Sequence, residues 1–223
     1  MAYRRTEKVV RRLAQRHAAI VDAGRALAAE AGMVAVQIAP VAKRAGIAAG
    51  TVYRYFPSKT ELVAAIVAAV SERELAAVRR AADAAPGPLS ALAAAITTLA
   101  ARALGRRRLA WAVIAEPVDP EIDAVRLVYR KALAAELETR LAAAMGGGHL
   151  PEQDVRVAAP ALVGALLEGL VGPLAPDAST SAAAARVAVQ ALTLFALRAV
   201  GIADARARGL VVQTAVPAPE EAG

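Results

Sequence analysis

The stretch that decides the fold is QIAPVAKRAGIAAGTVYRYFPSKTEL, residues 37–62. It predicts two short helices, over 38–45 and 49–55, on either side of a tight turn at Gly46. Pro57 ends the second helix because a proline restricts the residue before it. Two short helices joined by such a turn form a helix-turn-helix unit.

Longer helices are predicted on both sides of this unit. From 7 to 31, apolar residues recur at spacings of three and four, which marks one face of a helix, and Gly32 is a good stop. After the unit, Ser58 and Glu61 form a capping box just ahead of an apolar run. The helix that this box opens is expected to end at residue 81 or 82.

The rest of the chain predicts helices throughout, so the expected fold class is all-α. Hydrophobic residues make up 57% of the chain and aromatic residues only 3%, without the alternation that marks strands. Gly and Pro separate five further helices, expected near 89–104, 106–116, 120–145, 155–172 and 179–200. Pro160 implies that the fourth of these starts later, near Ala158, or is kinked. One of the breaks is expected at Gly172, Pro173 and Pro176.

Positive charge is concentrated at the N-terminal end. Residues 1–59 hold 11 Lys and Arg against three Asp and Glu, whereas the remaining 164 residues hold 16 against 17. A basic segment on a near-neutral body is typical of a polyanion binder. Charge alone leaves a solvated basic tail equally open.

Composition argues against several other kinds of protein. The chain has no cysteine and only two distant histidines, so we expect no disulfide, no metal site and no cofactor. The longest charge-free run, Ala84–Ala101, has 18 residues and is broken by Pro and Gly at 86–88, whereas a membrane span needs about 20 mostly apolar residues. No apolar segment follows the basic N-terminus, so no secretory signal is expected. These points predict a cytoplasmic protein without a membrane partner.

An enzyme and a non-specific DNA-binding protein are the alternatives. For an enzyme, the sequence lacks a Cys nucleophile, a His paired with a carboxylate at ligand spacing, a G-x-S-x-G pattern and a phosphate-cradling loop before a helix. We therefore expect no enzymatic activity. A nucleoid-type protein stays open, and binding in the presence of competitor DNA separates it from a sequence-specific one.

The helix-turn-helix unit presents a surface suited to duplex DNA. Apolar positions would pack its two helices together: Ile38, Val41, Ala42, Ala45, Ile47, Val52 and Phe56. The positions left to face outward are Ala48, Ala49, Gly50, Thr51, Tyr53, Arg54 and Tyr55. In such a unit the second helix enters the major groove, and small residues let the backbone approach the DNA. Lys59 lies at a helix N-terminus, where free N–H groups and the helix dipole add to its own charge.

Residues 37–62 resemble the DNA-binding signature of the TetR family of regulators. In register are the Ala42…Ala45-Gly46-Ile47 step, Gly50-Thr51-Val52-Tyr53, Tyr55-Phe56 and Ser58-Lys59…Glu61-Leu62. The match covers roughly residues 13–65 and is highly specific. The resemblance implies a ligand-responsive transcriptional repressor that binds a palindromic operator in double-stranded DNA as a homodimer.

Three positions depart from the family pattern. Gln37 stands where Thr or Ser is usual, which weakens the prediction of a helix cap and a phosphate contact there. Ala48-Ala49 replaces the commoner Ser-Lys pair and so removes a hydrogen-bond donor. Ala28 stands where a larger aromatic residue is frequent, which thins the core of the small domain.

The resemblance also assigns DNA contacts to individual residues. Phosphate contacts are expected from Thr51, Tyr55 and Lys59, groove contacts from Gly50, Tyr53 and Arg54, and a backbone contact from Arg44. Tyr53 as a packing residue and Arg54 as a solvated charge are the alternatives. The basic arm Arg4–Arg12 is expected either to contact the DNA backbone or minor groove, or to be disordered.

The last two long helices, near 155–172 and 179–200, are apolar nearly all round. A helix that is apolar on every side has to be buried on every side, which indicates burial against a second copy. The resemblance implies the same, an isologous dimer through a four-helix bundle to which each copy contributes both helices. Twin recognition helices then read half-sites about one helical turn or more apart.

A small-molecule effector is expected to bind among residues 89–145, whose Ala, Leu, Val and Ile side chains favour a largely apolar compound. The candidate ligand-binding residues are Arg102, Trp111, Tyr129 and Glu168. Trp111 as plain core is the alternative to Trp111 as the floor of a pocket. In the family, ligand binding moves the helix after the capping box, here the one beginning at Lys59, and this changes the spacing of the two reading heads.

These inferences divide the chain into three parts. Residues 1–58 are expected to form a three-helix helix-turn-helix domain with a basic N-terminal arm. Residues 59–202 are expected to form the helical ligand-binding and dimerisation domain, and 203–223 a partly ordered tail.

Overall fold

The computed structural model describes residues 2–175 and 181–217, with side chains from Glu7 onward. Within these ranges the chain forms ten α-helices, one short 3-10 helix and no β-strand. The predicted all-α fold class is therefore confirmed.

The N-terminal part, which we call the head, consists of α1 (Ala2–Ala31), η1 (Met33–Ala35), α2 (Ile38–Arg44) and α3 (Ala49–Tyr53). Gly32 ends α1 with φ 81°, and Gly46 forms the turn between α2 and α3 with φ 65°. This left-handed backbone favours glycine, so the predicted stop and the predicted turn are both confirmed. α3 ends two residues before the predicted end, because the Tyr55 N–H donates to the carbonyl of Val52 and closes the helix with a tighter turn.

α4 (Lys59–Asp83) begins at the predicted capping box. The Ser58 Oγ accepts a hydrogen bond from the Glu61 N–H at 3.1 Å, which satisfies one of the free amides of the first turn. The helix continues for 25 residues and ends just beyond the predicted end.

The remaining helices form what we call the body: α5 (Pro88–Gly105), α6 (Arg107–Ile114), α7 (Glu121–Gly146), α8 (Val155–Val171), α9 (Ala182–Ala199) and α10 (Asp204–Gln213). The first five correspond to the five predicted helices. α8 runs through Pro160, and the prediction of a start near Ala158 is wrong, because Asp154 accepts from the Arg156 N–H and fixes the N-terminus earlier.

Some predictions fall on residues that the structure does not describe. The predicted break at Pro176 and the first residues of the helix predicted from 179 lie outside the described residues, as do residues 218–223 of the predicted tail. The earlier part of that tail forms α10, in which Ala207, Leu210 and Val211 are buried.

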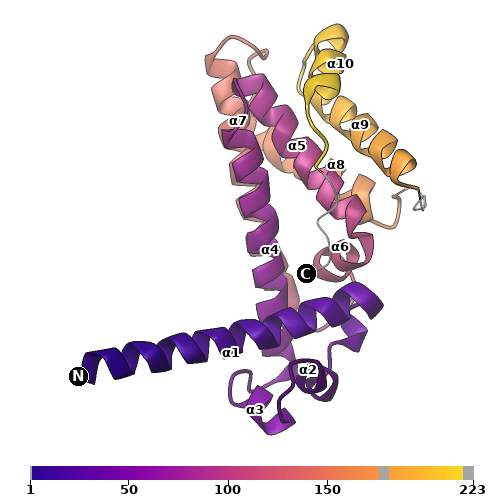
Figure 1. Ribbon diagram of the computed structural model, residues 1–223. Coiled ribbons are helices and arrows are strands. Elements are labelled where there is room, and N and C mark those ends of the chain that lie inside the picture. Colours follow the sequence, from indigo (N-terminus) through magenta and orange to yellow (C-terminus); the bar gives the residue numbers. More distant parts are fainter. Residues whose placement is uncertain (1, 176–180, 218–223) are drawn as a thin grey trace.

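Figure 1 shows an elongated molecule with the head at one end. α1 lies across the lower part of α4, and its N-terminal half extends beyond the rest of the head. α4 runs from the head into the body, where α5, α7, α8, α9 and α10 lie at the opposite end. One helix thus spans both regions.

The buried side chains form two hydrophobic clusters. The first joins the head to the beginning of α4 and to α6, and includes Ile20, Val52, Phe56, Ile66 and Leu109. The second lies in the body, where α5 and α7 pack with α8, α9 and the end of α4. α4 therefore contributes to both cores, and the head core continues past residue 58.

Two helices among the described residues are long and apolar enough, by length and composition, to cross a membrane. They are α5, of which 61% of the apolar window is buried inside the protein, and α9, of which 22% is buried. One or two such helices are weak evidence for a span, since the core helix of a globular domain passes the same test. The difference between them shows that α5 is already covered within one chain and α9 is not.

Candidate DNA-binding surface and effector cavity

The residues predicted to contact DNA lie on one end of the head. Ala48, Ala49 and Gly50 at the start of α3 are exposed, and so are Arg54 and Lys59. The Tyr53 side chain is 53% exposed, while Thr51 and Tyr55 are half-buried. A Cβ placed on Gly50 would meet no atom within 4 Å, so the surface at this point is open.

This surface is held by the packing beneath it. Val41 of α2 and Val52 of α3 are fully buried, and Phe56 is 4% exposed. The His17 ring of α1 contacts the Phe56 ring with centroids 4.8 Å apart. Ile38, Ala45 and Ile47, predicted as packing residues, are only partly buried and lie at the edge of this core.

Arg44 has an intramolecular partner within the head. Its guanidinium donates to both carboxylate oxygens of Glu30 in α1, one of them at 2.7 Å. This hydrogen bond lowers the pKa of Glu30, so the carboxylate stays charged. The pair joins α1 to α2, and a phosphate contact by Arg44 would compete with it.

Two departures from the family pattern have structural counterparts. The side chain of Gln37 forms no cap on α2; instead its Nε2 donates to the Val34 carbonyl at 3.0 Å. Ala28 is fully buried, with no exposed area. The head core is closed around this small side chain.

A small cavity lies where α4, α5, α6 and α7 meet. Its volume is about 30 Å³, and its wall includes Ser71, Glu74, Arg102, Val113 and Tyr129. Arg102 donates to Glu74 through Nε at 2.5 Å and through a terminal nitrogen at 3.0 Å. Burial raises the pKa of the Tyr129 hydroxyl, so the group stays neutral.

The structure brings together two of the four predicted ligand-binding residues. Arg102 and Tyr129 both line the cavity. Trp111 is half-buried on α6 and does not line it, and Glu168 lies in an open groove between α6, α7 and α8. The Glu168 carboxylate accepts from the Leu174 N–H at 3.0 Å, just after α8 ends.

Sequence reasoning missed the residues that join the cavity wall to the head. The loop after α6 places Glu116 at the start of η1, where its carboxylate accepts from the Met33 N–H at 2.8 Å. Arg108 of α6 donates to the Glu30 carbonyl at 2.7 Å, in the last turn of α1. These partners are about 80 residues apart, and no local pattern marks them.

Arg126 of α7 holds the end of α6 in place. Although it carries a charge, it is only 7% exposed. Its guanidinium donates to the carbonyls of Val113 at 2.9 Å, Ala112 at 3.1 Å and Glu116 at 2.7 Å. These acceptors include carbonyls that the end of a helix leaves without partners.

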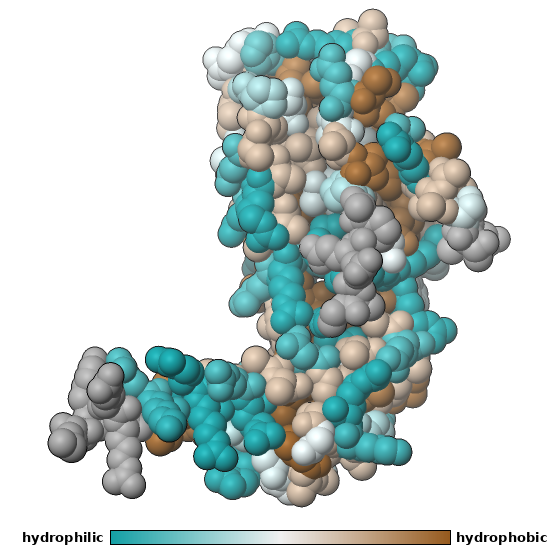
Figure 2. All heavy atoms as spheres, viewed as in Figure 1, coloured by the Kyte–Doolittle hydropathy of each residue, from teal (hydrophilic) through white to brown (hydrophobic). Residues whose placement is uncertain are grey.

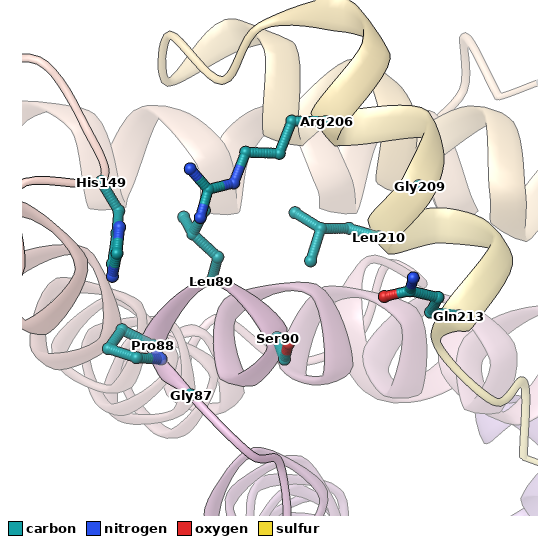
Figure 3. Close-up of a pocket in the computed structure, with 9 residues that line it drawn as sticks. All are labelled: Gly87, Pro88, Leu89, Ser90, His149, Arg206, Gly209, Leu210 and Gln213. Atoms are coloured by element: carbon teal, nitrogen blue, oxygen red, sulfur yellow. The ribbon is translucent and has the colours of Figure 1, made fainter.

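A second pocket lies at the end of the body that is farther from the head. Its volume is about 360 Å³, and it opens between the start of α5, the segment before α8 and α10. Figure 3 shows Arg206 and Leu210 of α10 and His149 pointing toward the first turn of α5. None of the predicted ligand-binding residues lines it.

α8 and α9 expose apolar side chains at helical spacing. On α8 the exposed positions include Val157, Pro160, Ala161 and Gly164, and on α9 they include Val187, Ala191 and Phe195. Val157 is 65% exposed, Val187 64% and Phe195 55%. In Figure 2, hydrophobic residues reach the surface over the α9–α10 part of the body.

Comparison with known proteins finds a family match that begins in α1 and ends in α4. Residues 20–66 match the sequence profile described as "Bacterial regulatory proteins, tetR family". This part of the chain, from α1 into α4, is therefore similar to the tetR family of regulatory proteins. The prediction that the chain is not an enzyme agrees with this similarity to regulatory proteins.

Two similar relatives are HTH-type transcriptional repressors named KstR. This chain is 49% identical over 59 residues to KstR of Rhodococcus jostii (strain RHA1), which is 26% of the chain and 28% of the relative. It is 44% identical over 78 residues to KstR of Mycolicibacterium smegmatis, which is 35% of the chain and 38% of the relative. The matched part thus spans well under half of these relatives.

Solved structures resemble this chain over most of its length. RolR in complex with resorcinol has a TM-score of 0.67 at 22% identity, covering 95% of this chain and 100% of RolR. FadR from Bacillus subtilis in complex with stearoyl-CoA has a TM-score of 0.63 at 21% identity, covering 78% of this chain and 96% of FadR. These likenesses show that the fold extends through the body.

Proposed function

We propose that this chain is a ligand-responsive transcriptional repressor, located in the cytoplasm. In this proposal it binds a palindromic operator as a homodimer and is released by a small, largely apolar effector. The observation that carries the proposal is the exposed surface of α3 and the residue after it, where Gly50, Tyr53 and Arg54 are exposed above the buried Val52. Residues 1–58 supply DNA recognition, and 59–202 supply effector binding and dimerisation.

DNA recognition follows from how α3 is presented. Its first residues are small and exposed, so its backbone approaches the floor of the major groove closely. Thr51, Tyr55 and Lys59 flank that contact and donate to phosphates. Arg44 contributes to the backbone contacts only when it leaves Glu30.

The homodimer is supported by the apolar faces of α8 and α9. An exposed apolar stripe such as Val187, Ala191 and Phe195 is unfavourable in water, and a second copy covers it. A two-fold axis at this face pairs each stripe with its equivalent and joins four helices. The heads of the two copies then bind the two half-sites of a palindrome.

Effector release is supported by α4. Ser71 and Glu74 of this helix line the cavity, and Lys59 begins the same helix beside α3. A compound that displaces the cavity wall therefore moves the heads relative to one another. RolR binds resorcinol and FadR binds stearoyl-CoA, so effectors on this fold differ greatly in size.

The test begins with selection of bound fragments from genomic DNA by the full-length protein. We expect an enriched palindrome that is retained in the presence of excess random DNA, and a protein that elutes as a dimer. Equal binding to random and selected fragments would instead indicate a non-specific DNA-binding protein. Elution as a monomer at micromolar concentration would refute the dimer.

Lys59→Ala tests the docking geometry on the selected fragment. Loss of one phosphate contact should weaken binding to all DNA sequences alike and reduce the slope of log affinity against log salt by about one unit. Arg80→Ala, an exposed arginine at the other end of α4, is the matched control and should change neither quantity. An unchanged affinity and salt slope in Lys59→Ala would exclude this orientation.

A further inference from the structure

A wall residue of the cavity between α4, α5, α6 and α7 has a buried polar group without a partner. The Ser71 Oγ has less than 1 Å² of accessible area and forms no hydrogen bond in the protein. A serine within a helix commonly donates to the carbonyl four residues earlier, and that bond is not formed here. A buried hydroxyl left in this state destabilises the protein, because it has lost its hydrogen bonds to water.

The charged groups of the cavity wall already have partners. Glu74 and Arg102 neutralise one another through two hydrogen bonds, with their side chains 21% and 14% exposed. Arg106, the third charged residue in the wall, is half-buried and has an interaction of its own. A compound with a net charge would have to break one of these interactions or remain unpaired in the cavity.

The rest of the wall combines apolar surface with one more neutral hydroxyl. Leu99, Leu109 and Val113 are each 3% exposed, and Tyr129 is 7% exposed. A cavity of about 30 Å³ has room for about two water molecules. A larger compound therefore enters only by moving the wall, of which α6 is the shortest helix.

We infer that the effector is a neutral compound with an apolar body and a hydroxyl or carbonyl oxygen that hydrogen-bonds to Ser71. This inference rests on the proposed function and specifies its effector. The compound satisfies the Ser71 hydroxyl, places its apolar body against Leu99, Leu109 and Val113, and leaves the Glu74–Arg102 pair intact. Its entry displaces α6, whose following loop contacts the head through Glu116.

The test uses thermal unfolding of the full-length protein with three matched pairs of probes. The neutral members are cyclohexanol, 4-ethylphenol and 1-octanol, and the charged members are cyclohexanecarboxylate, 4-ethylbenzoate and octanoate. At least one neutral member should raise the Tm and its carboxylate counterpart should not. No shift with any neutral member, or equal shifts with both members of every pair, would overturn the inference.

Variants of the hydroxyl groups locate the binding site. Without any probe, Ser71→Ala should raise the Tm by about 2–4 °C, because it removes the unpaired group. The same change should weaken binding of the neutral probe about tenfold. Ser90→Ala, in the pocket at the far end of the body, is the matched control and should change neither value. Tyr129→Phe, which also removes only a hydroxyl, provides a second variant with the expectation of weaker probe binding.

Operator binding separates this inference from the proposed function. If Ser71→Ala keeps the affinity for the neutral probe within twofold of the original, the effector assignment fails even though the protein binds its selected DNA fragment. If the protein binds no DNA fragment selectively, the proposed function fails whatever the probes do.

Discussion

The candidate DNA-binding surface of the head and the cavity wall of the body differ in how their polar groups are paired. In the head, Ser58 caps α4, Gln37 donates to a backbone carbonyl and Arg44 pairs with Glu30. In the body, Ser71 in the cavity wall has a buried hydroxyl without a partner, and Tyr129 belongs to the same wall. Local hydrogen bonds thus fix the proposed DNA-binding surface, whereas the proposed effector site retains a polar group that a ligand can satisfy.

Phe56→Ala should produce the largest effect, because it opens the head core. The side chain is 4% exposed and contacts His17 across the core. We expect the free energy of unfolding to fall by about 3–5 kcal/mol, measured by urea denaturation. Tyr53→Ala, at an exposed position three residues earlier, should stay within about 0.5 kcal/mol of the original. Similar losses in both variants would mean that the head has no separate core to protect.

Arg126→Met should have an intermediate effect, located where the body meets the head. It removes the donor to three carbonyls around the end of α6, and leaving such groups unpaired costs about 1–3 kcal/mol. Amide hydrogen exchange should quicken in α6 and in η1, the segment that Glu116 caps.

Arg130→Met is the control for Arg126→Met. Arg130 is exposed, and its one hydrogen bond, to the Ile114 carbonyl, is 3.5 Å long. Amide hydrogen exchange in Arg130→Met should match that of the original protein. If Arg126→Met exchanged faster in α6 but not in η1, the prediction that α6 stabilises η1 would be wrong.

Asp204→Asn should have the smallest effect, at the end of the body. Hydrogen bonds from Arg208 and Arg198 lower the pKa of Asp204, so the folded protein prefers the charged carboxylate. This stabilisation is complete above the ordinary aspartate pKa, about 3.9, and is lost as the pH falls through the lower folded value. The Tm of Asp204→Asn should therefore lie slightly below that of the original at pH 7 and converge with it near pH 2. A constant gap down to pH 2 would show that the carboxylate charge is not responsible.

The head could be predicted from sequence because its determinants are local. A positive-φ glycine at 46, the Ser58 cap and the apolar spacing of Val41 and Val52 each act within a few residues. The end of α3 was less predictable, since the turn that closes it depends on one backbone hydrogen bond of Tyr55.

The body could be predicted only as a series of helices. Its cavity depends on which faces of four helices meet, so Arg102 and Tyr129 were found by residue type while Ser71 and Glu74 were not. Trp111 was singled out as the one tryptophan, but its position on α6 turns it away from the cavity wall. No sequence pattern marks Glu116 as a contact residue, because its partner is the backbone of a segment 83 residues earlier.

The contact of Glu116 with η1 also bears on how such a protein diversifies. The Glu116 carboxylate accepts hydrogen bonds from the main-chain N–H groups of Met33 and Val34. A Cβ at position 32 would lie 3.0 Å from its oxygens. The connection therefore requires a glycine at 32 but is indifferent to the side chains at 33 and 34. Under the proposed function, a recombinant that carries a head with another operator preference would keep this joint, provided that the glycine is retained, so that operator and effector preference could change separately.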